Sequence, residues 1–337
     1  MEYIRAGAPQ YKANLHCHST LSDGRLSPPA LAAAYRSRGY SVLCITDHEY
    51  PCVHTDLSTP ELLLLTGYEA YIRPAADARM DPFGPEIHMN LFARQPQNNT
   101  YICWDPPFCK YMPPAEAAAL PKAGQAGPRR YTPAYINKFI AAARGAGYLV
   151  SYNHPGWSME AEADILAYEG CFSLEIFNTG AQQISGAECN GALYDRLLRS
   201  GRHLYCHGAD DNHNVHPFGD PRSDSFGAWT MLLAPELSYG AVIGALEKGD
   251  FYASTGPEIR ALSIDGTAVH IECSPAARIR MVESPKRTVQ AVADAGQTLT
   301  QADFVIPPEA PYVRFSVTAP DGTAAHTRAF FRAELGL

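Results

Sequence analysis

A histidine pair near the amino terminus, His16 and His18, has the residue type and spacing of a metal-binding site. Alternate side chains of an extended segment point to the same side, so both imidazoles can reach one point while Cys17 points away. Asp23 follows in a Ser-Asp-Gly turn, where the chain can bend back and bring a carboxylate to that point. Two ordinary polar strand positions would give the same pattern, so the pair needs support from elsewhere in the chain.

That support comes from polar residues placed where predicted strands end. The apolar runs that predict strands are 40–46, 62–66, 87–92, 148–152, 172–177 and 204–207. Helices are expected over 28–38, after Thr132, and near 192–200. The residues at or just past the strand ends are His48, Glu69, His88, His154, Asp211 and His213. A strand-helix rhythm predicts a largely parallel sheet, open or closed into a barrel, whose carboxyl edge assembles the site. Each residue alone has an ordinary structural explanation, but together they indicate a site.

The order of these motifs resembles the PHP family, named for polymerase and histidinol phosphatase, over about residues 15–256. The motifs are His16-x-His18, Ser22-Asp23-Gly24, Thr46-Asp47-His48, Glu69, His88, Asn153-His154-Pro155 and Asp211-x-His213. Within the family the chain looks most like stand-alone metal-dependent phosphoesterases, and Phe251–Pro257 resembles the branch of carbaryl-hydrolase-like proteins. The resemblance implies an α/β fold, a distorted (β/α)7 TIM-like barrel with up to three metals.

The resemblance also implies how the ligands are shared. His16, His18, Glu69 and Asp211 would surround one ion; Glu69, His88 and His154 a second; and Asp23, His48 and His213 a third. Mixed imidazole and carboxylate ligands without thiolates suit two or three divalent ions of zinc, manganese or iron. The Asp-x-His spacing favours Asp211 over Asp210 as the ligand. Asp210 and Asp47 are expected to hold ligand side chains in place without binding metal themselves.

The chemistry expected of such a cluster is hydrolysis. Two ions lower the pKa of a shared water and supply a bridging hydroxide as nucleophile, so no serine or cysteine nucleophile is needed. The predicted catalytic residues are His48, His213 and Asp211, although a metal-bound water could equally protonate the leaving group.

Three further residues are predicted to contact the substrate. Arg222 lies just beyond the last ligand and could fork onto a phosphate, the alternative being an ordinary surface arginine. Glu175 and Asn178, at the end of a predicted strand, are expected to line the pocket, the alternative being structural caps.

Composition limits the partners. The 337 residues are 46% hydrophobic and carry a net charge of −8, which argues against a nucleic-acid polymer because polyanion binding needs clustered cations. No apolar stretch approaches the ~18 residues of a membrane span, and residues 1–10 lack the pattern of a secretory signal. We therefore expect no membrane partner and a cytoplasmic location. The nine cysteines are scattered and form no Cys-x-x-Cys, as is typical of reduced core residues.

The strand-helix rhythm of the expected barrel domain, residues 1–260, is interrupted by one segment and is followed by a carboxyl-terminal segment of a different pattern. Residues 93–130 are rich in proline and carry aromatics such as Trp104 and Tyr111, which favours a lid over the site; a surface loop packed elsewhere is the alternative. Residues 261–337 alternate apolar and polar positions between turns such as Asp265-Gly266, which predicts a small antiparallel β accessory domain. Such a domain could form a homo-oligomer contact or bind a partner.

Three functional hypotheses follow. The leading one is a phosphoesterase acting on a small phosphorylated metabolite, such as a nucleotide or sugar phosphate. The second is a metallohydrolase of a carboxylic ester, amide or carbamate, which the same hydroxide could attack. The third, a metal-stabilised scaffold without activity, is disfavoured because all nine ligand positions are present.

Overall fold

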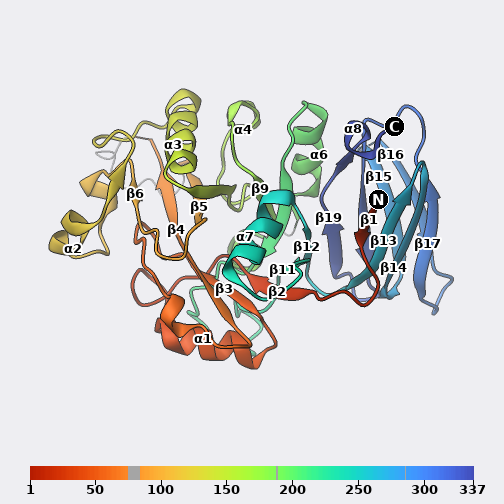
Figure 1. Cartoon of the computed structure of the whole chain (residues 1–337), viewed down its shortest axis with the longest axis horizontal. Coiled ribbons are helices and arrows are strands. Elements are labelled where there is room, and N and C mark those ends of the chain that lie inside the picture. The colour runs from red at the N-terminus through yellow and green to blue at the C-terminus, as the bar shows by residue number, and fades with distance from the viewer. Residues whose placement is uncertain (75–83, 187–188, 285) are drawn as a thin grey trace.

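The structure is a computed structural model of the whole chain and describes residues 1–74, 84–186, 189–284 and 286–337. Figure 1 shows an elongated molecule with an α/β part at one end and mainly β-strands, coloured blue, at the other. A mixed α/β fold, as predicted, is therefore present.

The α/β part is built on seven strands of one long sheet. In spatial order they are β10 (Tyr205–Ala209), β9 (Ser173–Asn178), β8 (Tyr148–Tyr152), β5 (Ile87–Ala93), β4 (Leu63–Ile72), β3 (Val42–Ile45) and β2 (Tyr11–Asn14). β2, β3 and β4 pair in parallel, as do β8, β9 and β10. β5 lies between the two groups and is antiparallel to both β4 and β8. The expected parallel sheet thus has one reversed strand.

A closed barrel is not confirmed. Among the described residues no ladder joins β10 to β2, and only the isolated bridge between Cys17 and Asn212 connects the segments that follow them. There His18 N donates to Asn212 O at 3.0 Å, and Asp211 N donates to His16 O at 2.9 Å. The two strands end at Asn14 and Ala209, before their chains come together. The sheet is therefore open, because no ladder closes it. The segments that follow β2 and β10 nevertheless meet beside the predicted ligands.

Helices connect the strands. They are α1 (Pro28–Ser37), α3 (Pro133–Gly145), α4 (Glu162–Ala167), α5 (Thr179–Ser185), α6 (Gly191–Arg199) and α7 (Tyr239–Lys248), with a 3-10 turn η1 (Thr55–Leu57). α1 and α3 both begin at proline, which fits the first helical turn because its N–H needs no partner there. Thr132 caps α3 by accepting from Tyr135 N, as predicted, whereas Ser27 makes no side-chain cap bond to α1.

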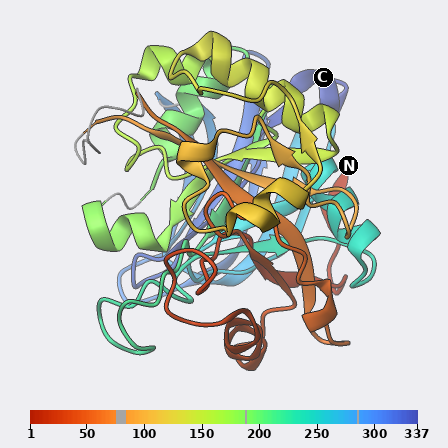
Figure 2. The same cartoon turned by 90° about the vertical axis from the view of Figure 1, so that its left-hand side faces the viewer.

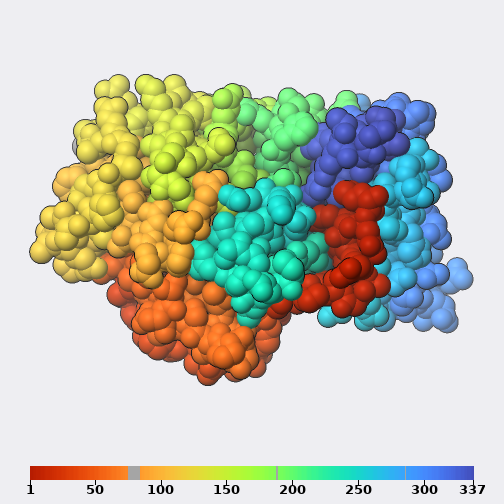
Figure 3. Space-filling view, in the orientation of Figure 1, coloured from red at the N-terminus to blue at the C-terminus, as the bar shows by residue number. Residues whose placement is uncertain are grey.

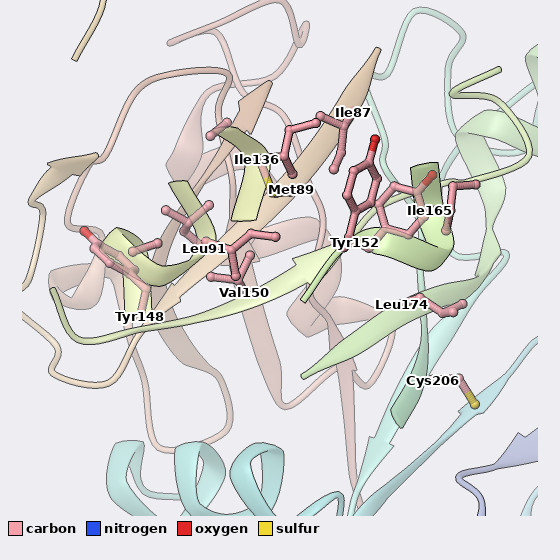
Figure 4. Packing of buried hydrophobic residues seen from close by; sticks show 14 of the residues in the cluster. Ile87, Met89, Leu91, Ile136, Tyr148, Val150, Tyr152, Ile165, Leu174 and Cys206 are labelled. Atoms are coloured by element: carbon pink, nitrogen blue, oxygen red, sulfur yellow. The ribbon is translucent and has the colours of Figure 1, made fainter. Parts of the chain in front are cut away.

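Alternation along the strands separates the core from the site. Tyr68, Ala70 and Ile72 of β4 belong to the largest hydrophobic cluster, so Glu69 and Tyr71 between them face the other side. The same holds in β5, where Ile87, Met89 and Leu91 pack into that cluster, leaving His88 on the opposite face. Figure 4 shows these β5 residues beside Val150 and Tyr152 of β8 and Ile136 of α3. Burial of the apolar face therefore turns the polar face toward the site.

Residues 93–130 form an insertion of short elements. These are β6 (Tyr101–Ile102), η2 (Pro106–Phe108), α2 (Pro114–Ala119) and β7 (Lys122–Ala123). Figure 2, which looks at the molecule from the end opposite the carboxyl terminus, shows this segment in front. Tyr101, Ile102 and Phe108 are buried, so the insertion is packed onto the body rather than extended into solvent.

The remaining strands continue the long sheet and add a second one. β11 (Trp229–Leu232), β12 (Phe251–Ser254), β19 (Ala324–Thr327), β18 (Tyr312–Thr318), β15 (Arg278–Ser284) and β16 (Arg287–Val292) follow β2 in the long sheet. The second sheet is β1 (Glu2–Ile4), β13 (Ile259–Asp265), β14 (Ala268–Ala276) and β17 (Leu299–Val305). The last elements are β20 (Phe330–Phe331) and α8 (Arg332–Leu335).

The carboxyl-terminal strands share a hydrophobic cluster with Ile4 of the amino-terminal strand. The red first strand accordingly lies against the blue strands in Figure 3. β12 belongs to the expected barrel domain and β19 to the expected accessory domain, and the two strands pair through hydrogen bonds. The domain boundary at residue 260 therefore stays a prediction. Within the described ranges, no helix has the length and apolar character needed to cross a bilayer.

Candidate metal centre

All nine predicted ligands come together at one edge of the sheet. Their donor atoms form four overlapping groups in which the atoms lie within 4.8 Å of one another. The groups are His16, His18 and Glu69; His16, His154 and Asp211; His48, Glu69 and His88; and His18, Asp23, His48 and His213. The chain brings in these residues just after β2, β3, β8 and β10, and within β4 and β5.

His88 reaches this edge by a route that differs from the prediction. It stands near the amino end of β5 rather than past a carboxyl end. Because β5 runs antiparallel to β4, its amino end lies at the carboxyl end of its neighbours, and His88 pairs in register with Tyr71. Glu69 likewise lies inside β4, which extends further than the predicted strand 62–66.

The histidine pair of the centre, His16 and His18, is fully buried. His16 Nε2 and His18 Nε2 are 3.2 Å apart, and each lies 3.1 Å from Asp211 Oδ1. Cys17 packs into a hydrophobic cluster with α1, so the two imidazoles share a side and the cysteine does not, as expected of an extended segment. Asp211, not Asp210, is the carboxylate that meets the histidine pair.

Glu69 occupies the middle of the arrangement. Its Oε1 lies 3.1 Å from His88 Nδ1 and 3.3 Å from His154 Nε2, and its Oε2 lies 2.9 Å from His48 Nδ1. Asn153 Nδ2 donates to Oε1 at 2.8 Å. His16 Nε2 also lies 3.2 Å from Oε1, and His18 Nε2 lies 3.4 Å from Oε2. One carboxylate is therefore close to five imidazoles, the position expected of a bridging ligand.

The outer part is more accessible. Asp23 Oδ2 lies 3.7 Å from His48 Nε2, and Asp23 Oδ1 lies 3.5 Å from His213 Nε2. The exposed fractions of the His48 and His213 side chains are 13% and 26%, against 0% for His16 and His18. Among the imidazoles of the cluster, these two are the most accessible to a substrate.

The observed grouping differs in part from the expected one. Asp23, His48 and His213 meet as predicted, with His18 added to them. His154 is grouped with His16 and Asp211, whereas His88 is grouped with His48 and Glu69. The nine residues form one continuous cluster, and the number of ions and the division of ligands between them stay predictions.

The donor set fits divalent cations. Asp23 Oδ1, His48 Nδ1 and Glu69 Oε2 are buried and make no hydrogen bond within the described part of the chain. Buried polar atoms normally have partners, so these donors are consistent with a cation held between them. Nitrogen and carboxylate oxygen donors are those that zinc, manganese and iron accept.

The electrostatics of the centre also fit a bound divalent cation. Burial alone would lower the pKa of His18, but the nearby carboxylates of Asp211 and Glu69 raise it to about 10. Burial would raise the pKa of Glu69, but the charges of His16, His88 and His48 bring it well below the usual value. The carboxylates thus favour a proton on His18, and the same negative charge would stabilise a divalent cation.

Glu175 holds two candidate ligands, His16 and His154, in place. It is fully buried, its Oε1 lies 2.7 Å from His16 Nδ1, and its Oε2 accepts from His154 N at 2.9 Å and from Asn178 Nδ2 at 2.7 Å. A carboxylate on one imidazole nitrogen fixes the ring so that the other nitrogen faces the ligand position. Neither Glu175 nor Asn178 lines the cavity described below, and their role in substrate binding stays a prediction.

The two aspartates expected to support ligands do so indirectly. Asp47 accepts from Ser19 N and from the hydroxyls of Ser19 and Ser22, and so fixes the turn that carries Asp23. Asp210 accepts from Tyr35, Thr179 and the backbone of residues 226–228. Both organise loops, and no described hydrogen bond joins either side chain to a candidate ligand.

Arg222 lies outside the cluster. Its side chain is 67% exposed and forks onto Asp220, with Nε 3.0 Å from Oδ1 and Nη2 2.9 Å from Oδ2. It would have to leave this partner to bind a phosphate, and its contact with substrate stays a prediction.

A cavity of about 250 Å³ opens onto the centre. Besides seven of the candidate ligands, it is lined by Tyr111 of the expected lid and by residues that the sequence reasoning did not identify. The latter are Tyr71, Arg73, Glu86, Lys110, Trp157, Ala181 and Ile184. The Tyr111 hydroxyl donates to Asp23 Oδ2 at 3.3 Å, which places this part of the expected lid beside the site.

Glu86 could have been found from the sequence. Its Oε1 lies 3.3 Å from His88 Nε2, while His88 Nδ1 faces Glu69. Glu86-x-His88 has the same alternate spacing as His16-x-His18, which places both side chains on one face of an extended segment. No comparable pattern marks Arg73 or Lys110.

Backbone conformation is unusual at the centre. His154 and Asp211 have positive φ of 25° and 53°, and Glu49, next to His48, has φ of 52°. Non-glycine residues rarely adopt this region, and such residues cluster at functional sites. α5 also lies very close to the loop, since a Cβ on Gly180 would stand 2.6 Å from Asp211 O.

Comparison with known proteins gives no established relative. No family model and no curated protein sequence matches the chain. A two-domain protein from Bacteroides vulgatus ATCC 8482, containing a predicted PHP-like metal-dependent phosphoesterase, is 16% identical with a TM-score of 0.46; the match covers 97% of this chain and 98% of that one.

Two further structures are similar over part of the chain. A proposed metal-dependent phosphoesterase from Bifidobacterium adolescentis ATCC 15703 is 19% identical, with a TM-score of 0.38 and coverage of 65% of this chain and 94% of that one. An amidohydrolase from Chromobacterium violaceum, with bound sulfate and no metal, is 16% identical, with a TM-score of 0.37 and coverage of 60% and 87%. At these values the similarity establishes no activity for this chain, and the carbaryl-hydrolase-like branch is not shown.

Proposed function

We propose that this protein is a metal-dependent phosphoesterase that hydrolyses a small phosphorylated metabolite. The observation that carries the proposal is the convergence of His16, His18, Glu69 and Asp211 with five further ligand candidates, because seven of these nine residues line one cavity. Two or three divalent ions of zinc, manganese or iron would be held there. When bound, such ions lower the pKa of water and neutralise charge on substrate oxygens.

The protein's own residues supply position and access. Glu175 holds His16 with Nε2 toward the centre, and Asn153 fixes Glu69 by donating to Oε1. His48 and His213 line the cavity and are exposed enough to meet a substrate. Burial and the charge of His18 lower the pKa of His213, so its imidazole stays neutral near pH 7 and suits a ligand or proton acceptor better than a proton donor.

The second candidate function is hydrolysis of a carboxylic ester, amide or carbamate. Its support is the aromatic lining of the cavity by Tyr71, Tyr111 and Trp157, which can pack against a planar neutral substrate as well as a phosphate ester. The proposed partner is in either case a small molecule. A cytoplasmic location and a homo-oligomer remain predictions from the sequence.

The test is a metal-defined activity panel. Protein stripped with a chelator and reloaded separately with zinc, manganese or iron is assayed on a phosphomonoester, a phosphodiester and an aryl carboxylic ester, with bound metal measured by elemental analysis. We expect metal-dependent hydrolysis of a phosphate ester to exceed that of the carboxylic ester. Faster turnover of the carboxylic ester would favour the second candidate function over the phosphoesterase. Absence of bound metal would exclude both functions.

A further inference from the structure

Two cavities meet at the candidate metal centre. The cavity described above, called here the aromatic cavity, has a neighbour of about 490 Å³, called the outer cavity. Both are lined by Asp23, Ile184, Asp211 and His213. The outer cavity adds Gly180, Gln183, Val215, His216, Arg222 and Asp224. Three of the candidate ligands, Asp23, Asp211 and His213, therefore lie in a wall common to the two spaces.

α5 stands between the two cavities. Ala181 faces the aromatic cavity, Gln183 faces the outer cavity, and Ile184 lines both. The helix is fixed in this place because Gly180 N donates to Asp210 O at 2.8 Å. A Cβ at position 180 would stand 2.6 Å from Asp211 O, so the close approach requires glycine. Both spaces are thus held against the segment that carries Asp211.

The two cavities offer different chemistry. In the aromatic cavity, the side-chain cations of Arg73 and Lys110 lie 5.5 and 5.9 Å from the Tyr71 ring centroid, and neither has a carboxylate within 4.0 Å among the described residues. In the outer cavity, Arg222 is already paired with Asp220, and Val215 is 60% exposed. One space thus suits a planar or polar group, and the other a less polar group.

Exposed apolar side chains mark the rim. Ile184 is 75% exposed although it lines both cavities, and Val215 of the outer cavity is also exposed. Covering such side chains with a bound group removes apolar surface from water and favours binding. A substrate with groups on both sides of the centre would cover both.

We propose that the substrate is a phosphodiester whose phosphate sits at the shared wall while its two ester groups occupy the two cavities. This rests on the proposed phosphoesterase function and deepens it. Water adds its oxygen to phosphorus, one P–O ester bond breaks with its electron pair passing to the departing oxygen, and that oxygen takes a proton from the water. The products are an alcohol and a phosphomonoester. A monoester has a single ester group and would leave one cavity without a role.

The experiment fills the outer cavity. Val215→Trp and, separately, Gln183→Trp place a large side chain there without touching a candidate ligand. Val289→Trp is the matched control, because Val289 is 48% exposed on β16 and lines neither cavity. The metal-loaded wild type and the three variants are assayed on bis(p-nitrophenyl) phosphate and p-nitrophenyl phosphate, with metal content checked in each.

We expect the wild type to prefer the diester. Both cavity variants should lower the diester-to-monoester ratio of kcat/KM about tenfold, mainly through KM, while Val289→Trp leaves it unchanged. An unchanged ratio in both cavity variants, or a wild type that prefers the monoester, overturns this inference while leaving the phosphoesterase function in place. If the metal-loaded protein hydrolyses neither phosphate ester, the proposed function fails and the inference fails with it.

Discussion

The guanidinium of Arg129 is buried against the carboxylate of Glu49, with Nη2 2.9 Å from Oε2 and Nη1 bound to Oε1. Arg129 lies near the carboxyl end of the insertion, residues 93–130, and Glu49 comes directly after the candidate ligand His48 in the sequence. Tyr101, also in the insertion, donates its hydroxyl to the same carboxylate. The insertion is thereby joined to the turn that positions one side of the metal centre.

Breaking this pair should be costly. Arg129→Met would leave the Glu49 carboxylate buried with fewer partners, and we expect the free energy of unfolding to fall by about 3–5 kcal/mol. The double variant Glu49→Gln/Arg129→Met removes both charges and should lose less. Chemical denaturation measures each value. Arg196→Met is the control, because its pair with Glu162 is about half exposed and should contribute less than about 1 kcal/mol. Equal losses in the Arg129 and Arg196 variants would contradict the importance of the buried pair.

The metal centre should depend on its histidine pair. His16→Ala removes a nitrogen that lies close to Glu69 and Asp211, so bound metal and hydrolysis should fall together. Elemental analysis and a phosphate ester assay on the same preparation check this. His203→Ala, at a ring stacked on Phe331 away from the centre, serves as the control. Retained turnover with full metal occupancy in His16→Ala would exclude this centre.

Glu175→Gln tests the support of that histidine. The amide can still bond to neighbours but no longer offers a negative carboxylate oxygen to His16 Nδ1, and such changes behind a ligand typically cost about 10–100-fold in metal affinity. Competition with a chelating dye gives the affinity. At saturating metal, activity should recover, which separates positioning from loss of fold. Glu162→Gln, at an exposed carboxylate, should leave the affinity unchanged.

Much of the site was predictable because local patterns determine it. The i, i+2 spacing of His16 and His18 places both imidazoles on one side of any extended segment, whatever the tertiary fold. The proline starts of α1 and α3 likewise follow from the sequence alone. These features need no knowledge of neighbouring strands.

Features that depend on distant partners were not predictable. The direction of β5 depends on its pairing with β4 and β8, and nothing in residues 87–92 specifies it. The burial of Arg129 against Glu49 depends on two side chains that are 80 residues apart in the sequence. Barrel closure was expected from the family resemblance and is not confirmed: among the described residues, the segments that follow β2 and β10 pair at the isolated bridge between Cys17 and Asn212 and not through a ladder.

The last prediction concerns pH and two histidines outside the metal centre. Burial and the charges of Arg314 and Arg280 lower the pKa of His326 well below 6.5, and Arg314 Nη1 lies 2.9 Å from His326 Nδ1. In the unfolded chain this histidine binds a proton below about pH 6.5, but in the folded protein it does not. The unfolded state then holds more protons, so stability falls as pH decreases below 6.5, by at most about 1.4 kcal/mol per pH unit for this one group.

His326→Asn should therefore flatten the loss of stability below pH 6.5. His270→Asn should act in the opposite direction, because hydrogen bonds to Asp303 and Glu272 raise the pKa of His270. Its contribution is fully present below pH 6.5 and disappears as pH rises through the folded-state value, so this variant should be weakened on the acid side only. Denaturation of both variants and the wild type from pH 5 to 8 gives the two difference curves. Slopes of the same sign would show that His326 is not held neutral in the folded protein.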